Sequence, residues 1–156
     1  MRLKYAKRGE DTEQAKVIIW AEKHMHKYPE LRWLYHIPNG GSRDSGEAIK
    51  LKQMGVKRGV SDLCLPFPRG GYHGLYIEMK YGKNRLTEDQ AQFLYDMRNT
   101  GNCAAVCHDA QAAEALIEIY VSMRGEDLIF PESFKDESVE RDRYGIVHIR
   151  STQPFA

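Results

Sequence analysis

The sequence lacks the marks of membrane, secreted and disulfide-bonded proteins. No apolar run approaches the ~20 residues that a membrane-spanning helix needs, and the N-terminus has no apolar stretch typical of a signal peptide. The three cysteines, Cys64, Cys103 and Cys107, include no CxxC pair. An odd number at this spacing argues against a disulfide framework and favours a reducing compartment. We therefore expect a cytoplasmic protein with no membrane partner.

Several catalytic motifs are missing as well. No GxSxG nucleophile elbow occurs, which argues against a Ser-His-Asp hydrolase of that kind. Cys103, Cys107 and His108 make a poor zinc site, because no second ligand pair lies at finger-like spacing. An HNH-type nuclease is also disfavoured, since the histidines and asparagine that it would need are not suitably spaced (His24, His26, His36, Asn39 and His108).

The chain's 156 residues, with 42% hydrophobic and 29% charged content, suit one globular core. The net charge of +1 hides an uneven distribution. Residues 43–58 hold five basic and two acidic side chains, whereas residues 126–142 hold seven acidic and two basic ones. A basic stripe fits a polyanionic partner, although a randomly mixed surface would give a similar count. We divide the chain into a core domain, 1–125, and an acidic C-terminal extension, 126–156, which ends in one possible strand.

Hydrophobic periodicity and turn residues predict the order of the elements. Helices are expected from Asp11 or Thr12 to about residue 26, and over 45–54, 87–99 and 109–123. Strands are expected over 31–37, around Asp62, over 74–80, over 102–107 and over 144–149. This order is typical of a mixed α/β fold.

The strand 74–80 organises the rest of the chain. Alternate side chains of a strand point to opposite faces, so the apolar residues of this strand share one face (Leu75, Ile77 and Met79). Glu78 and Lys80 share the other face. If the Asp62 strand pairs alongside, two carboxylates and a lysine converge. Hard cations such as Mg²⁺ prefer such oxygen ligands, although the same residues could form only a solvated surface pair.

The surrounding motifs identify a family resemblance. The segments GVKRGVSDL (55–63), LYIEMK (75–80) and LTEDQ (86–90) resemble the blocks of VRR-NUC domains, members of the PD-(D/E)xK nuclease superfamily. The resemblance covers roughly 11–120, and it departs at Ser61, where the family usually has proline. It implies a restriction-endonuclease-like core with a central mixed β-sheet flanked by helices.

The resemblance also implies a site and a cofactor. Asp62, Glu78, Lys80 and Gln90 would be catalytic. Mg²⁺ or Mn²⁺ would be held by Asp62, Glu78, the Met79 carbonyl and Glu13, and no nucleotide cofactor is expected. Two alternatives stay open: Glu13 could simply favour the helix macrodipole, and Gln90 could simply complete a capping box with Thr87.

DNA is the expected partner. Six residues near the site are candidate contacts to it (Asn39, Arg43, Lys57, Arg58, Lys83 and Arg85), although Asn39 could be only a turn residue. The resemblance implies a metal-dependent endodeoxyribonuclease acting on branched DNA such as Holliday junctions, in phage or prophage replication or repair within the bacterial host cytoplasm. The alternatives are a restriction-type endonuclease on linear duplex and an inactive DNA-binding protein of the same fold.

A homodimer is expected, because symmetric cutting of a junction needs two sites. The chain also carries more large aromatics outside its central strands than one small core needs (Trp20, Trp33, Tyr35, Phe130, Phe134 and Phe155). The alternative is that they cover the back of the sheet.

Overall fold

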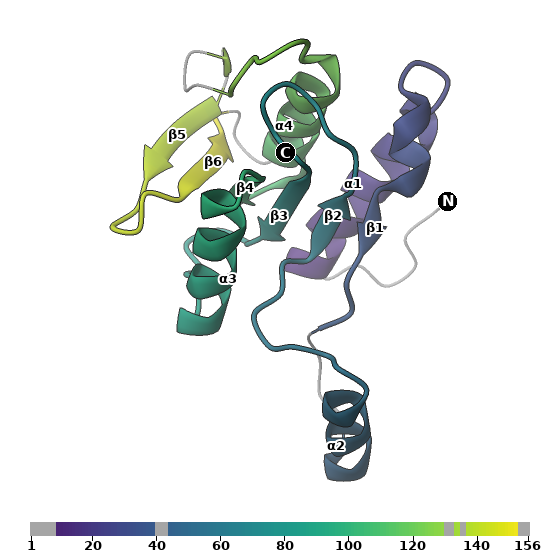
Figure 1. Cartoon of the computed structure of the whole chain (residues 1–156), viewed down its shortest axis with the longest axis vertical. Coiled ribbons are helices and arrows are strands. Elements are labelled where there is room, and N and C mark those ends of the chain that lie inside the picture. The colour runs from purple at the N-terminus through teal and green to yellow at the C-terminus, as the bar shows by residue number, and fades with distance from the viewer. Residues whose placement is uncertain (1–8, 40–43, 130–132, 135–136, 153–156) are drawn as a thin grey trace.

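The computed structural model describes residues 9–39, 44–129, 133–134 and 137–152. Helices lie on both faces of a mixed six-stranded sheet (Figure 1), so the predicted α/β class is confirmed. The helices are α1 (Glu10–His24), the 3₁₀-helix η1 (Pro29–Trp33), α2 (Ser45–Gln53), α3 (Glu88–Asn99) and α4 (Ala110–Ser122). The strands are β1 (Tyr35–His36), β2 (Leu63–Leu65), β3 (Leu75–Met79), β4 (Cys103–Cys107), β5 (Glu137–Arg141) and β6 (Val147–Ser151).

The strands lie in the order β1-β2-β3-β4-β6-β5. β1, β2 and β3 pair antiparallel, whereas β4 pairs parallel with both β3 and β6. Parallel neighbours need a crossover connection, and α3 and α4 supply it between β3 and β4 and between β4 and β6. β5 closes the sheet as the antiparallel partner of β6.

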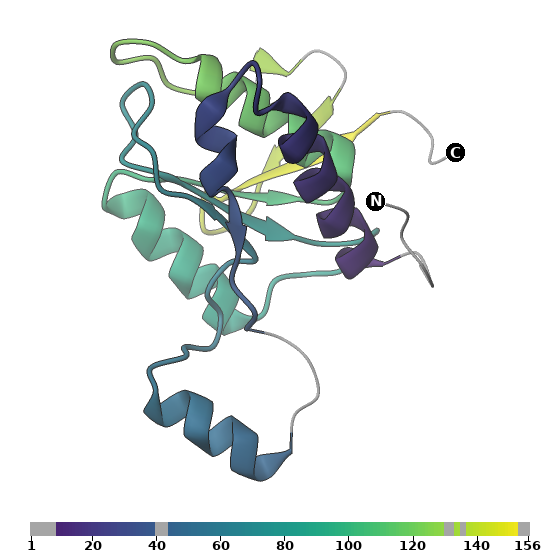
Figure 2. The same ribbon diagram turned by 90° about the vertical axis from the view of Figure 1, so that its right-hand side faces the viewer.

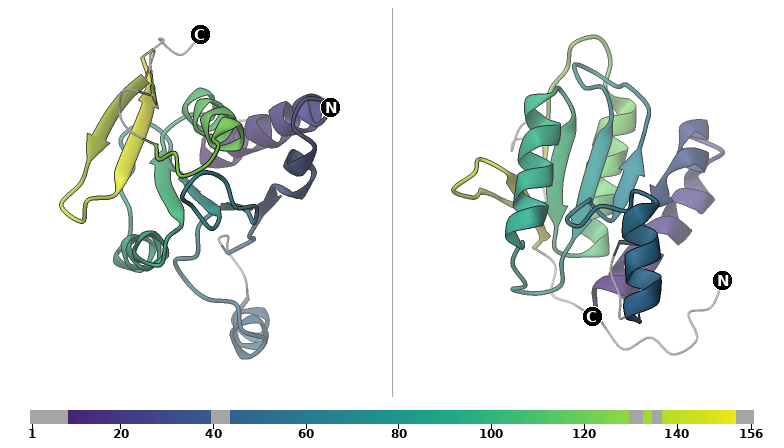
Figure 3. Two further views of the ribbon diagram at one scale, coloured as in Figure 1. Left: turned by 45° about the horizontal axis from the view of Figure 1, so that its top comes forward. Right: turned by 60° about the horizontal axis from the view of Figure 1, so that its bottom comes forward.

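Two hydrophobic layers hold the helices to the sheet. α1 and α4 lie on one face and α3 on the other (Figure 3). The predicted apolar face of β3 is confirmed, because Leu75, Ile77 and Met79 are fully buried in the core under α1 and α4. On the opposite face Leu94 of α3 packs with Val106 of β4 in a smaller cluster.

Local sequence signals set most of the helix boundaries. Thr87 and Gln90 form a capping box at the start of α3, and Asp109 caps α4 through the Ala112 amide. α2 ends before Gly55, whose φ of +97° suits glycine. Unlike the other helices, α2 buries none of its residues and projects from the body of the protein (Figure 2).

Three expectations need correction. The predicted strand over 31–37 is mostly the 3₁₀-helix η1, since Pro29 at its first turn favours a helical turn, and only Tyr35–His36 is a strand. α1 begins at Glu10 after Gly9, without a side-chain cap. The C-terminal region contributes two strands rather than one, and β6 pairs directly with the central strand β4.

Among the described residues, no helix is both long and apolar enough to cross a membrane.

Candidate active site

The pairing of β2 with β3 brings the two predicted carboxylates together. Leu63 lies opposite Ile77 in the antiparallel register, so the preceding residue, Asp62, falls opposite Glu78 on the same face of the sheet. Asp62 Oδ2 accepts a hydrogen bond of 2.8 Å from the Met79 amide. The side chain of Asp62 is therefore fixed to the strand that carries Glu78.

Glu78 is almost completely buried, with 2% of its surface exposed. Its Oε1 accepts hydrogen bonds from Gln90 Nε2 at 2.6 Å and from Lys80 Nζ at 3.1 Å. Its Oε2 is also buried, yet no described group hydrogen-bonds to it. An unsatisfied buried carboxylate oxygen is costly, and this one lies beside a second carboxylate.

Electrostatics at the site favour an added positive charge. Burial, and then the charge of Asp62, raises the pKa of Glu78 to about 8, against the opposing effect of Lys80. Burial likewise raises the pKa of Asp62, although the Met79 amide and Lys80 oppose it. Two neighbouring carboxylates in a poorly hydrated site resist joint ionisation. A bound cation would instead favour the ionised form of both carboxylates.

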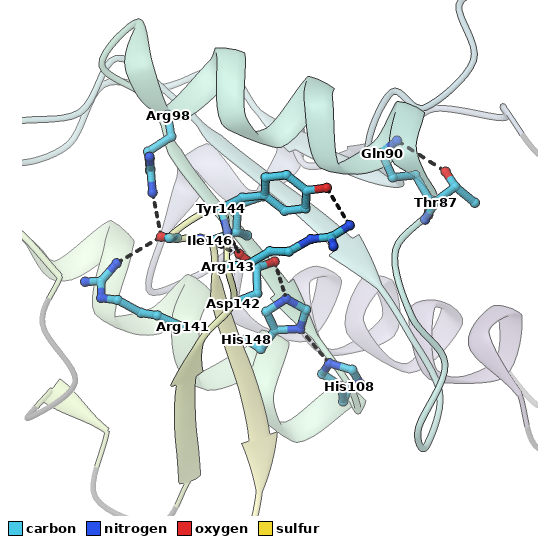
Figure 4. Close-up of polar contacts among 11 residues, drawn as sticks. Thr87, Gln90, Arg98, His108, Arg141, Asp142, Arg143, Tyr144, Ile146 and His148 are labelled. Carbon is cyan, nitrogen blue, oxygen red and sulfur yellow. Dashed lines mark hydrogen bonds and ion pairs between the residues drawn. The ribbon is translucent and has the colours of Figure 1, made fainter.

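Gln90 forms the predicted capping box and also contacts Glu78. Its backbone amide donates to Thr87 Oγ1 (Figure 4), and its Oε1 accepts from the Thr87 amide, so the two residues form a complete capping box. Its Nε2 donates to Glu78 at the same time. The helix cap therefore fixes the orientation of the amide that holds Glu78.

The structure does not bring Glu13 to this cluster. Glu13 is buried, but its Oε2 accepts from the Ala110 amide at the start of α4, and its Oε1 accepts from Lys16. Two acids of α1 line the cleft with Asp62 and Glu78, Glu10 and Asp11, and the charge of Glu10 helps to raise the pKa of both carboxyl groups. Sequence analysis missed Glu10 because the predicted helix began one residue after it.

The candidate DNA contacts divide between two surfaces. Asn39 and Arg58 line the cleft of about 650 Å³ that contains Asp62 and Glu78, and Lys57 is exposed beside Arg58. Lys83 and Arg85 line a neighbouring groove instead. Arg43 lies outside the described residues.

The site offers oxygen ligands for a hard cation. Asp62 and Glu78 supply carboxylate oxygens, and the unsatisfied Oε2 of Glu78 is available as a metal ligand. No group of three or more His, Cys, Asp or Glu side chains suited to a metal occurs in the described part of the chain. Mg²⁺ is commonly held by one or two carboxylates, with water completing its shell. The residues therefore fit Mg²⁺ or Mn²⁺ better than a metal that needs a full protein cage.

Comparison with known proteins agrees with this geometry. The VRR-NUC domain model matches residues 8–111, which include every residue of the site. A solved structure described as a VRR_NUC domain protein is 31% identical, with a TM-score of 0.66. The alignment covers 78% of this chain and 94% of that one. No curated protein matches the chain.

Gly59 determines how closely the Asp62 loop approaches α3. Its φ is +80°, and a Cβ built there would lie 2.4 Å from the backbone carbon of Asp89. Gly55 has a similar φ of +97°, but a Cβ there would meet nothing within 4 Å. Gly59→Ala must therefore displace the backbone of Asp89 as well as strain the backbone at residue 59.

We predict that Gly55→Ala costs about 1–2 kcal/mol, the usual strain of this conformation, and that Gly59→Ala costs clearly more. The measurement is the free energy of unfolding from urea denaturation of the two variants. Equal destabilisation would show that the close contact between the loop and α3 is absent.

Proposed function

The chain belongs to the VRR-NUC domain family, nucleases of the PD-(D/E)xK type, and from this premise we propose that it is a metal-dependent endodeoxyribonuclease. One observation supports the proposal above all: the buried Glu78, with its unsatisfied Oε2, lies opposite Asp62 on the same face. A buried carboxylate pair is costly unless a cation joins it.

The side chains have separate roles in the proposed reaction. Asp62, Glu78 and the Met79 carbonyl would hold Mg²⁺ or Mn²⁺, and the bound cation supplies a Lewis acid that lowers the pKa of water and stabilises phosphate charge. Gln90 keeps Glu78 oriented through its 2.6 Å hydrogen bond. Lys80, whose Nζ lies 3.1 Å from Glu78 Oε1, would orient the attacking water or stabilise negative charge in the transition state.

We predict that the protein cuts DNA in Mg²⁺ or Mn²⁺ and that a chelator abolishes cutting. Asp62→Asn and Lys80→Ala should each lower the single-turnover rate at least ~10²-fold, the usual loss for one transition-state contact. DNA binding should remain. Asp96→Asn is the matched control, because Asp96 is exposed and bonds Gln92 within α3. Cutting by Asp62→Asn at the control's rate would overturn the proposed site.

We propose branched DNA as the substrate. Direct reading of sequence needs side chains that reach base edges, whereas backbone contacts carry no sequence information. The candidate contacts on both surfaces are mainly lysines and arginines, which suit phosphates. We therefore expect these contacts to recognise the shape of DNA rather than its sequence.

A panel of four-way junction, flap, single-stranded and linear duplex DNA tests this choice. We predict that the four-way junction is cut fastest and at defined positions, because the enzyme selects backbone shape. The initial rates at equal DNA concentration are the measurement. Equal rates on all four substrates, or preference for one duplex sequence, would contradict the proposal.

We also propose that the protein works as a homodimer. Phe134 is buried and Trp20 packs against the core, so these two aromatics do cover the sheet. Trp33 and Tyr35 are about half exposed beside the edge strand β1. Phe130 and Phe155 lie outside the described residues.

The projecting helix α2 gives further support for a dimer. It has only nine residues and buries none of them, whereas isolated helices of that length are marginal in water. Three apolar side chains on α2 and the loop after it are exposed (Ile49, Met54 and Val56). Packing of α2 against a second copy would cover them.

Light scattering of the purified protein without DNA tests the dimer. We predict twice the chain mass of 18.0 kDa and, for Ile49→Asp, a shift towards the monomer because a charge cannot be buried there. Glu47→Gln, on the same helix, is the control for α2. A wild-type protein at the monomer mass at micromolar concentration would contradict a stable dimer.

A further inference from the structure

A second groove lies on the other side of the α3 N-terminus from the catalytic cleft. It has a volume of about 640 Å³ and runs between the segment 83–88, the start of α3 and the β5–β6 hairpin. Figure 4 shows the hairpin residues Arg143, Tyr144 and His148 near α3. Five cationic side chains line the groove, against three acidic ones (Lys83, Arg85, Arg141, Arg143 and Arg150; Glu88, Glu140 and Asp142).

All five of these cations are available to a ligand. Within the described part of the chain, none of them forms an ion pair (Lys83, Arg85, Arg141, Arg143 and Arg150). Arg150 Nη1 donates to the Gly82 carbonyl at 2.7 Å, which leaves further donors on its guanidinium. Arg143 lies over the ring of Tyr144, 4.8 Å from its centre, and donates to the Tyr144 hydroxyl. These contacts position both arginines without neutralising them.

The acid nearest the hairpin tip is occupied by internal contacts. Asp142 Oδ1 accepts from the amides of Tyr144 and Ile146, which closes the turn. Asp142 Oδ2 contacts His148 Nε2 at 3.0 Å. Burial opposes ionisation of Asp142, but the hydrogen bonds from His148 and the two amides outweigh it and lower its pKa.

A chain of two histidines ties the hairpin to the centre of the fold. His148 Nδ1 lies 3.0 Å from His108 Nε2, and His108 Nδ1 donates to the Gly82 carbonyl. Since a carbonyl and a carboxylate only accept, both outer nitrogens must carry protons. The inner two nitrogens face each other and complete the chain. Burial lowers the pKa of His108 to about 4, so its imidazole is neutral near pH 7.

The groove is continuous with the catalytic cleft. Thr87 lines both, and Asn84, which lines the groove, donates to Glu10 of the cleft at 2.9 Å. A DNA strand that leaves the cleft past the start of α3 therefore meets the groove next. The hairpin lies beyond residue 111, the last residue of the family match.

We propose that this groove holds the phosphate backbone of one duplex arm of the substrate beside the cut, with Arg143 and Arg150 as its contacts from the hairpin. Lys83 and Arg85 contact the same arm from the opposite wall. The histidine chain keeps the hairpin in place for this contact. The inference rests on the proposed function for the identity of the ligand, but not on the chemistry at Asp62.

The test is binding of fluorescently labelled duplex and four-way junction DNA, with Ca²⁺ in place of Mg²⁺ to prevent cutting, at several salt concentrations. Each phosphate contact contributes about 0.9 to the slope of log affinity against log salt. We expect Arg143→Gln to lower the slope by about 0.9 and Arg143→Gln/Arg150→Gln by about 1.8, with weaker binding at every salt concentration. Arg124→Gln, an exposed arginine outside both the groove and the cleft, should change neither quantity.

Arg150 also donates to the Gly82 carbonyl, so its replacement could displace the hairpin. The single variant Arg143→Gln keeps this hydrogen bond and therefore tests DNA contact alone. Its melting temperature should match that of the wild type. Wild-type slopes and affinities in both variants would overturn the proposal that the groove binds DNA. A wild-type protein that binds DNA with the expected slope changes in the variants but never cuts would overturn the proposed chemistry and support the groove.

Discussion

The candidate active site depends on one interaction, the antiparallel pairing of β2 with β3. This register places Asp62 opposite Glu78 and directs both carboxylates to the face covered by α3. Leu63 and Ile77, next to them, point into the core under α1 and α4 and are fully buried. A slip of one residue would exchange the two faces and bury the carboxylates in that core. The hydrophobic core therefore fixes the position of the acids.

Bringing the two carboxylates together raises the free energy of their ionised forms, and hydrogen bonds from the protein compensate for this only in part. The Met79 amide holds Asp62, and Gln90 and Lys80 hold one oxygen of Glu78. The other oxygen of Glu78 remains buried and unsatisfied among the described residues. Local conflicts of this kind are expected at functional sites. The capping box that starts α3 also orients Gln90 towards Glu78. The formation of this helix therefore positions one side chain of the candidate site.

Sequence patterns predicted the parts that depend on neighbouring residues. The alternation in β3, the capping box of Thr87 and Gln90, and the helices predicted over 45–54 and 109–123 depend on local signals, and each is confirmed. The contacts that sequence analysis missed join distant segments. Glu13 reaches the Ala110 amide 97 residues away, and His108 reaches His148 40 residues away. No spacing rule shows such partners, because only the packing of α1 on α4 and of β6 on β4 creates them.

The most direct test of the central claim is to locate the cation. A crystal of the wild-type protein soaked in Mn²⁺ gives an anomalous signal at each bound ion, independent of any cleavage assay. The carboxylate pair predicts a peak within coordination distance, about 2.0–2.2 Å for a small hard cation, of both an Asp62 oxygen and Glu78 Oε2. Mn²⁺ bound elsewhere, with Glu78 Oε2 still uncoordinated in the same crystal, would contradict the assignment of this pair as the metal site.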